Sequence, residues 1–214
     1  QVPDLPMTRM LPLLTALLLT ATAAEAAPLE PTPAQTEGPY YPRQRPAETD
    51  ADLTHIGSGP AANGAVLLVK GRVLDTNAAP VAGARVEIWQ VDHQGIYLHP
   101  GDPAVAKRDK AFQAYGEVLT DTAGRFAFRT IDPPAYAGRP RHIHAKITPP
   151  GGTTLTTQFY FKDDPLLARD GIVRRLGKAI ERVMLTPVKA GTGAEMEASI
   201  DIVSRLAHGF QADV

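Results

Sequence analysis

Residues 142–161, HIHAKITPPGGTTLTTQFYF, contain two segments of strand character, 142–148 and 155–161, on either side of a Pro-Pro-Gly-Gly turn. Successive side chains of a β-strand point to opposite faces of a sheet. His142 and His144 therefore share one face, while Ile143 points into the opposite layer. The stretch predicts a β-hairpin that presents two imidazoles on one surface.

Strand patterns recur at short intervals in the rest of the chain. The clearest is residues 125–131, which alternate polar and apolar side chains after a turn at residues 121–124. Residues 94–115 form a long polar segment of loop character, and a short helical piece is expected after Asp164. These patterns predict an all-β fold, an antiparallel β-sandwich with long active-site loops and little helix. Further strands are predicted at residues 65–74, 85–90, 117–120 and 196–203.

Composition narrows the class of protein. The chain has 214 residues and a formal net charge of -1, which fits one globular domain with a short appendage. This charge balance gives no support for a nucleic-acid partner or an anionic membrane surface. The absence of cysteine excludes disulfides, thiolate metal ligands and a cysteine nucleophile.

Residues 1–26 have the order of segments that is typical of a secretory signal peptide. A short basic start at residues 7–10 precedes a leucine-rich run at residues 11–20, and the pattern Ala24-Glu25-Ala26 follows. The apolar run is too short to span a bilayer. We expect a chain that is exported, periplasmic or secreted, and cut near Ala26, with one domain over residues 27–214 and no membrane anchor in the mature form. A short N-terminal helix or anchor is the alternative interpretation.

An H-x-H pattern on a strand occurs by chance in many β proteins, so His142 and His144 alone do not establish a metal site. Two tyrosines strengthen the case. Tyr136 lies just before the predicted strand, and Tyr97 lies in the long polar segment. Phenolates are hard anionic ligands that stabilise ferric iron, and imidazoles complete a mixed nitrogen and oxygen site. The combination indicates ferric iron rather than zinc.

Several motifs together resemble those of the intradiol ring-cleavage dioxygenases, in particular the protocatechuate 3,4-dioxygenase type. The motifs are TEGPYYP at residues 36–42, VEIWQ at 86–90, GIYLHP at 95–100, TIDPPAY at 130–136, RPRHIH at 139–144 and QFYF at 158–161. The resemblance implies a β-sandwich enzyme with Fe(3+) as its cofactor and O2 as a co-substrate. Its substrate would be a catechol-type ring, cleaved between the two hydroxyl-bearing carbons to a muconate-type dicarboxylic acid.

The resemblance also implies roles for particular residues. The iron ligands would be Tyr97, Tyr136, His142 and His144. The catalytic groups would be Arg139, Gln158 and Tyr136, of which Tyr136 leaves the iron and accepts a substrate proton. The substrate-binding wall would consist of Thr36, Gly38, Pro39 and Tyr40. Arg139 is permanently cationic and suits negative charge that develops on the ring.

One departure from the family pattern leaves the particular catechol open. Ala137 and Gly138 stand where protocatechuate enzymes often carry an aromatic residue after the tyrosine. A full set of ligands within one chain favours a homo-oligomer over a compulsory partner of a second kind.

Other interpretations remain. An exported, non-catalytic β-sandwich binding module would need none of these tyrosines and would bind no iron. A cupin-type oxygenase would add a carboxylate and a further histidine to the H-x-H pair. The alternative role of Arg139 is an ion pair with Glu87 or Asp132, and that of Gln158 is to satisfy a backbone group. Trp89 is expected in the core with its indole N–H hydrogen-bonded.

Overall fold

The computed structural model of the protein describes residues 27–191, 193 and 195–206, and β-strands are its main regular secondary structure. Short helical turns lie mainly between the sixth and seventh strands. In chain order the elements are β1 (Val66–Leu74), β2 (Arg85–Trp89), η1 (Val105–Lys107), β3 (Tyr115–Leu119), β4 (Arg125–Ile131), β5 (His142–Thr148), β6 (Leu155–Phe161), η2 (Leu167–Arg169), α1 (Gly171–Leu176), η3 (Gly177–Val183), β7 (Met184–Leu185), β8 (Val188–Lys189) and β9 (Met196–Val203).

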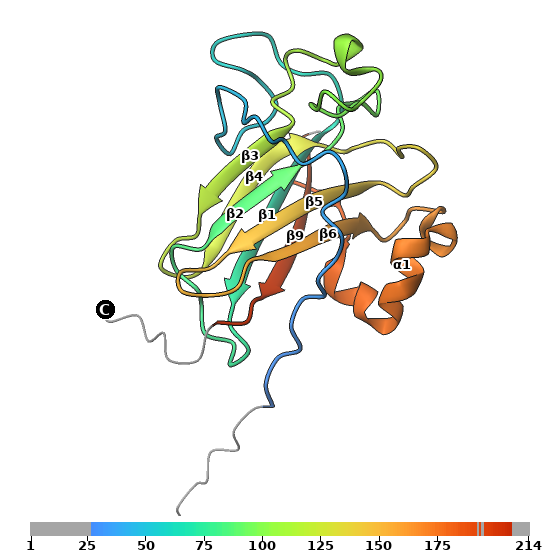
Figure 1. Ribbon diagram of the computed structural model, residues 1–214. Coiled ribbons are helices and arrows are strands. Elements are labelled where there is room, and N and C mark those ends of the chain that lie inside the picture. Colours follow the sequence, from blue (N-terminus) through green and yellow to red (C-terminus); the bar gives the residue numbers. More distant parts are fainter. Residues whose placement is uncertain (1–26, 192, 194, 207–214) are drawn as a thin grey trace, which may run out of the picture.

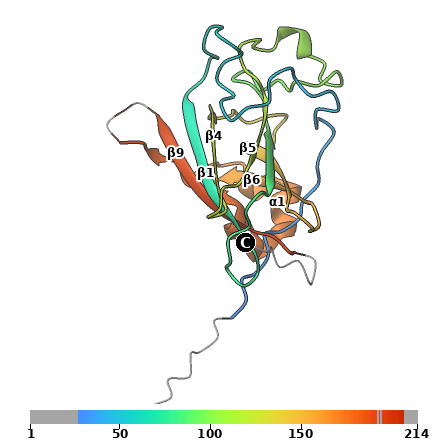
Figure 2. The same cartoon turned by 90° about the vertical axis from the view of Figure 1, so that its left-hand side faces the viewer.

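The strands form two facing sheets, which Figure 1 shows from the front and Figure 2 from the side. One sheet has the order β4-β1-β9-β8 and the other the order β3-β2-β5-β6-β7. The predicted β-sandwich with little helix is confirmed. The sheets are mixed rather than purely antiparallel, because β1 pairs in parallel with β9 and β6 pairs in parallel with β7.

The strands with the clearest alternation begin and end where the sequence predicted. This holds for β4, β5, β6 and β9. Strand β3 begins at Tyr115, two residues before the prediction, because Tyr115 extends the ladder by pairing with Trp89 of β2. The helical piece expected after Asp164 is α1 with its flanking turns η2 and η3.

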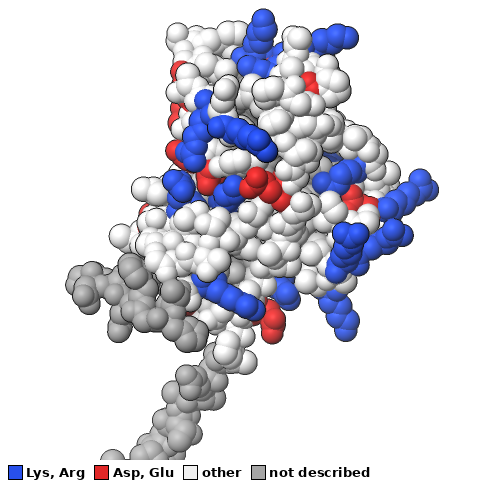
Figure 3. Space-filling view, in the orientation of Figure 1, with Lys and Arg blue, Asp and Glu red and all other residues white. Residues whose placement is uncertain are grey.

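The short helix α1 has charged residues that suit both of its ends. Asp170 is the N-cap, and its side chain accepts hydrogen bonds from the backbone N–H groups of Ile172 and Val173. Arg174 and Arg175 lie in the last turn, where cations interact favourably with the helix dipole. Figure 3 shows Lys and Arg side chains gathered over this helix, at the right of the view.

The hydrophobic core lies between the two sheets. Ile88 of β2, Ile143 of β5 and Phe159 of β6 point into it from the five-stranded sheet and are fully buried. Val69 of β1 and Phe128 of β4 meet them from the other sheet. Burial of each such side chain is worth about 1.5–3 kcal/mol. Because side chains alternate, the neighbours of these residues on β2, β5 and β6 are directed to the outer face of the five-stranded sheet.

The N-terminal segment of the described chain crosses that outer face, as Figures 1 and 2 show in blue. Its backbone docks on β6, where the N–H of Gln35 donates to the carbonyl of Thr156 at 2.8 Å. The hydroxyl of Thr157 donates to the carbonyl of Pro33 at 2.9 Å. The segment therefore shields part of the sheet that would otherwise face water.

The predicted signal peptide, residues 1–26, lies outside the described residues, so export remains a prediction. Within residues 27–191, 193 and 195–206, no helix has the length and apolar character needed to cross a membrane.

We predict that Gly71→Ala destabilises the fold. Gly71 lies on β1, and a Cβ atom there would overlap the backbone carbonyl oxygen of Ile200 and lie 2.5 Å from Cζ of Phe126. Forcing an extra carbon into a packed sheet typically costs about 1–3 kcal/mol. The matched control is Gly171→Ala in α1, because a Cβ atom at that position would meet nothing within 4 Å. Urea denaturation should show a lower free energy of unfolding for Gly71→Ala alone, and equal effects of the two changes would contradict the close approach at Gly71.

Candidate metal centre and active site

Three polar side chains converge on one point at the outer face of the five-stranded sheet. The hydroxyl oxygen of Tyr97 lies 3.3 Å from Nε2 of His142 and 3.1 Å from Nε2 of His144. All three side chains are buried, with relative exposures of 2%, 4% and 4%. The two histidines come from β5, as their spacing predicted, and Tyr97 comes from the loop after β2. The structure therefore brings together three of the four predicted ligands by direct contact.

Each imidazole is held by a different neighbour. Nδ1 of His142 lies 2.7 Å from the carbonyl oxygen of Pro140. A carbonyl can only accept, so Nδ1 carries the proton and Nε2 keeps a free lone pair. The ring of His144 stacks on Trp89, with centroids 4.8 Å apart and planes 12° from parallel. Trp89 is buried as predicted, but its indole nitrogen has no hydrogen-bond partner among the described residues, contrary to the expectation.

Two aspartates shape the loop that carries Tyr97. The carboxylate of Asp102 accepts a hydrogen bond from the backbone N–H of Tyr97 at 2.9 Å. Asp92 accepts from the backbone N–H groups of Gln94 and Ile96 at 2.8 and 3.1 Å. Short polar side chains that bond to nearby backbone groups favour turns of this kind. The loop is therefore fixed on both sides of the tyrosine.

The fourth predicted ligand, Tyr136, lies beside Tyr97. Its ring meets that of Tyr97 edge-on at a centroid distance of 5.2 Å, and its hydroxyl donates to the hydroxyl of Tyr40 at 3.1 Å. Ala137 and Gly138 form a tight turn after it, both with positive φ, at 49° and 77°. The turn closes through a hydrogen bond from the N–H of Arg139 to the carbonyl of Tyr136. Tyr136 and Arg139 are thereby placed side by side.

Burial sets the protonation states of the cluster. Loss of solvation lowers the pKa of His142 to about 4 and the pKa of His144 well below its usual range, so both rings are neutral at pH 7. Burial also raises the pKa of Tyr97 and that of Tyr136. Neutral imidazoles can bind a cation, and the phenols would need a cation to lose their protons.

The donor set therefore fits a metal ion that accepts both nitrogen and oxygen ligands. No group of three or more His, Cys, Asp or Glu side chains suited to a metal occurs within the described part of the chain. The cupin-type alternative, which requires such a group, finds no support. A metal at His142 and His144 would have to take its remaining protein ligands from tyrosines.

Arg139 lies next to this cluster and makes three polar contacts. Its Nε donates to Oδ2 of Asp170 at 2.8 Å. One terminal nitrogen lies 3.3 Å from Nε2 of His142, and the other donates to the hydroxyl of Tyr160 at 3.3 Å. The guanidinium therefore faces the predicted ligands directly.

The two ion-pair partners considered for Arg139 from sequence were both wrong. Glu87 pairs with Arg45 at 3.1 Å, and Asp132 pairs with Arg141 at 2.8 Å. The partner of Arg139 is Asp170, which lies 31 residues further along the chain.

Gln158 lies opposite His144 in the ladder between β5 and β6 and is fully buried. Its Nε2 donates to the backbone carbonyl of Thr36 at 2.9 Å, and its Oε1 lies 3.1 Å from the hydroxyl oxygen of Tyr160. Gln158 thus satisfies a backbone group, the structural role considered from sequence, while lying next to the histidine cluster.

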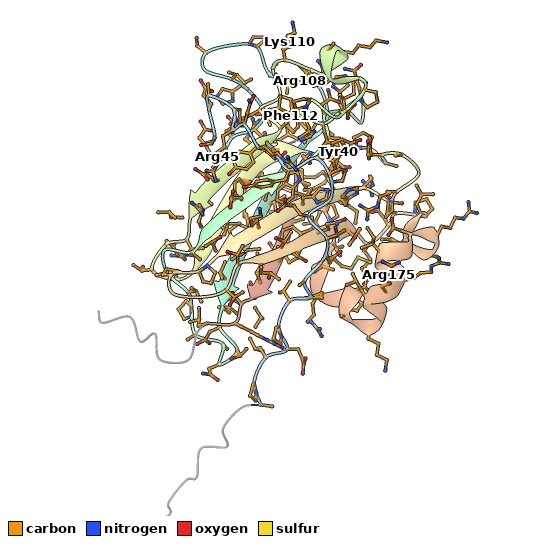
Figure 4. All side chains as sticks on the ribbon, in the orientation of Figure 1. Tyr40, Arg45, Arg108, Lys110, Phe112 and Arg175 are labelled. Carbon is orange, nitrogen blue, oxygen red and sulfur yellow. The ribbon has the colours of Figure 1, made fainter. Side chains whose placement is uncertain are left out.

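Two of the four predicted substrate-binding residues, Gly38 and Tyr40, lie against the cluster. Gly38 has φ of 75°, and a Cβ atom there would lie 3.4 Å from Cε1 of His144, so the backbone passes close over that ring. Tyr40 stacks on Tyr97 with centroids 4.9 Å apart, where the N-terminal segment meets the upper loops (Figure 4). The hydroxyl of Thr36 accepts from the N–H of Gly38 at 3.3 Å, and Pro39 is exposed.

Sequence reasoning missed Asp170, Tyr160 and Gln35. Asp170 is also the N-cap of α1, and it lies 31 residues from Arg139, so the sequence carries no local signal of their contact. The register of the predicted hairpin could have identified Tyr160, because it pairs with His142 across the ladder. The hydroxyl of Tyr160 donates to Oε1 of Gln35 at 2.8 Å, a contact between distant segments that leaves no local signal.

A cavity of about 810 Å³ opens beside the Tyr97 loop. It lies between residues 42–48 and residues 98–113, and its lining includes Leu98, His99 and Arg108. None of the four predicted metal ligands lines it. Nδ1 of His99 accepts a hydrogen bond from the N–H of Gly101 at 2.9 Å, which helps to fix this loop.

Comparison with known proteins places this site in context. The model of a protein family described as "Dioxygenase" matches residues 36–205. The protocatechuate 3,4-dioxygenase beta chain of Burkholderia cepacia is 36% identical, covering 78% of this chain and 76% of that relative. Catechol 1,2-dioxygenase 2 of Acinetobacter lwoffii is 30% identical, covering 69% of this chain and 60% of that relative.

A solved structure agrees with both. The dioxygenase domain of a dioxygenase carbohydrate-binding protein fusion from Streptomyces sp. SirexAA-E superposes with a TM-score of 0.67 at 32% identity, covering 83% of this chain and all of that domain. The family match covers the Tyr97 loop, the β5–β6 hairpin and the segment that begins at Thr36. The resemblance inferred from the motifs is thereby confirmed, and the chain belongs to the intradiol ring-cleavage dioxygenase family.

Proposed function

We propose that this ring-cleaving oxidoreductase holds one iron(III) through Tyr97, Tyr136, His142 and His144. Its reaction would open a catechol-type ring between the two hydroxyl-bearing carbons, with insertion of both atoms of O2, to give a muconate-type dicarboxylic acid. The convergence of the Tyr97 hydroxyl with two imidazole nitrogens, beside Tyr136, is the observation that carries the proposal.

The charges of the donor set suit a trivalent cation. Two tyrosinates and one hydroxide cancel a formal charge of 3+, so that the site can remain buried without an unpaired charge. Bound iron(III) would withdraw electron density from a chelated catecholate and open a ring carbon to O2. Zinc prefers tetrahedral sites of histidine, cysteine and carboxylate, and tyrosinate oxygens favour the harder ferric ion.

Tyr136 would have two roles. It would accept a proton from the substrate, and its movement would make room for the substrate to enter. Its hydroxyl bonds to Tyr40, which together with Tyr97 covers the site. Ala137 and Gly138 are exposed, so the turn that follows Tyr136 can move without disturbing β5. With the metal bound, Tyr136 as a tyrosinate would accept one proton of the incoming catechol, and a hydroxide would accept the other. No separate histidine base is then needed.

Arg139 and the N-terminal segment surround the incoming ring. The cationic guanidinium lies against His142 and would stabilise negative charge as it develops on the ring and on oxygen. Gly38 leaves room over His144 because it has no side chain, and Tyr40 provides an aromatic wall. These positions support the assignment of Thr36, Gly38, Pro39 and Tyr40 to substrate binding. Gln158 would act by fixing Thr36 next to the bound ring.

We predict that the tyrosines and histidines differ in their effect on iron. The parent protein loaded with iron(III) should contain one iron per chain and absorb visible light, because tyrosinate bound to iron(III) has a charge-transfer band. His142→Ala should lose iron. Tyr136→Phe should retain iron, because the contacting group of Tyr97, His142 and His144 stays intact and Tyr136 is the ligand that leaves, but it should bind catechol more slowly.

Metal analysis and visible absorption spectra provide the measurements. Tyr41→Phe is the matched control, because Tyr41 donates to Glu87 rather than to the cluster, and it should behave as the parent. A parent protein that takes up zinc alone, or stays colourless after ferric loading, would refute the iron(III) assignment.

We predict that Arg139 governs turnover rather than substrate binding. Loss of a preorganised charged donor typically costs about 10²–10³ in rate, so Arg139→Leu should turn over that much more slowly. Arg139→Lys should recover only part of the rate, because an ammonium lacks the planar fork.

Product identification with catechol, hydroxyquinol and protocatechuate tests the cleavage position. A yellow semialdehyde, formed by cleavage outside the two hydroxyls, would show that the intradiol assignment is wrong.

We also propose that the chain is exported and loses residues 1–26, on the basis of the basic start, the leucine-rich run and the A-x-A pattern. Mass spectrometry of the mature protein from its native host should find an N-terminus near Ala27. Recovery of peptides that contain Met7 from the mature protein would count against export with cleavage.

A homo-oligomer remains a proposal that rests on the complete ligand set within one chain.

A further inference from the structure

Asp170 holds the arginine of the proposed active site. Its Oδ2 accepts from Nε of Arg139 at 2.8 Å, and the two side chains are 4% and 24% exposed. Figure 1 shows how this contact arises, because the helical region around α1 lies beside the loop between β4 and β5. A partly buried, charge-assisted hydrogen bond of this length is among the stronger polar contacts in a protein.

The carboxylate of Asp170 is itself fixed by the helix that it caps. Oδ1 accepts from the backbone N–H groups of Ile172 and Val173 at 2.8 and 2.9 Å, which leaves Oδ2 directed at the arginine. Burial would raise the pKa of Asp170, but hydrogen bonds from Arg139 and from the Val173 backbone outweigh it and lower the pKa. The group is therefore a carboxylate at neutral pH.

The other side of the guanidinium is held by Tyr160. One terminal nitrogen of Arg139 donates to the Tyr160 hydroxyl at 3.3 Å, and this hydroxyl lies 2.8 Å from Oε1 of Gln35 and 3.1 Å from Oε1 of Gln158. With Nε on Asp170 and one terminal nitrogen on Tyr160, the remaining terminal nitrogen is the one that faces His142.

We propose that Asp170 is a positioning residue of the ring-cleavage reaction, which orients Arg139 so that one terminal nitrogen faces the reacting ring. This inference rests on the proposed function of Arg139. A free arginine side chain samples many rotamers, and this freedom must be lost to reach one orientation. Asp170 is fixed as the N-cap of α1, so its hydrogen bond to Arg139 restricts the arginine side chain before substrate binds. Catalysis depends steeply on such placement, since an error of about 1 Å can cost about 10² in rate.

The variant that separates positioning from helix capping is Asp170→Asn. Asparagine caps helices about as well as aspartate, so α1 keeps its N-terminal hydrogen bonds. Its amide nitrogen would then face Nε of Arg139, so that two donors meet and the guanidinium loses its anchor. The matched control is Asp132→Asn, which replaces one of the two carboxylate oxygens that accept from Arg141 at 2.8 and 2.9 Å, and so disturbs the ion pair of an arginine whose side chain makes no hydrogen bond to the predicted ligands.

We expect Asp170→Asn to lower kcat about 10–100-fold with little change in KM, because the arginine acts on charge that develops during the reaction. Iron content and the visible spectrum should match those of the parent. In the double variant with Arg139→Leu, Asp170→Asn should cause no further loss, because its effect passes through Arg139. Asp132→Asn should leave kcat and KM near the parent values.

A readout that does not depend on activity is the exchange of the Arg139 Nε–H with water, measured by nuclear magnetic resonance in the metal-free protein. This exchange should become faster in Asp170→Asn and stay unchanged in Asp132→Asn.

Parental kcat in Asp170→Asn, together with slow turnover in Arg139→Leu, would overturn the positioning role and leave the proposed function intact. An additional loss in the double variant, or unchanged exchange of the Arg139 Nε–H in Asp170→Asn, would also overturn it. A parent enzyme that opens no catechol ring would overturn the proposed function and this inference together.

Discussion

The alternation of side chains along β5 is the constraint on which both the core and the candidate site depend. Ile143 enters the core, while His142 and His144 point to the other face. The same holds across the sheet, where Trp89 and Gln158 stand beside His144 in the ladder. A slip of one residue in this register would place imidazoles in the core and apolar side chains at the site. The register of β5 that buries Ile143 in the core is therefore the same register that places His142 and His144 at the candidate site.

Water is excluded from the histidines on the outer face of the five-stranded sheet because another part of the chain covers that face. The segment from Gln35 to Tyr41 lies over β5 and β6, and its contacts satisfy polar groups that would otherwise be buried without partners. Tyr41 and Tyr115 donate to Glu87 at 2.7 and 2.6 Å behind Trp89. Unpaired groups of this kind would cost about 1–3 kcal/mol each. The cover also removes water from the histidines, which keeps them neutral.

The sequence predicted what depends on local pattern and did not predict what depends on distant partners. The strands β4, β5, β6 and β9 follow from alternation alone, and the convergence of Tyr97 with the histidines agrees with the motif match. Alternation carries no information on strand direction, so the parallel pairing of β9 with β1 was missed. The contact between Arg139 and Asp170 joins segments on opposite sides of the β5–β6 hairpin. No local rule selects Asp170 over Glu87 or Asp132 as its partner.

The position of β9 has a consequence for the order in which the chain can fold. This last strand lies inside its sheet, between β1 and β8, and the ion pair of Lys70 with Glu197 joins residues 127 positions apart. Pairings of such long range must overcome the entropy of closing a large loop, which slows folding. During synthesis β1 lacks this neighbour until the chain as far as β9 has emerged, after all the other described strands. The four-stranded layer therefore closes only after the strands of the facing sheet have been made.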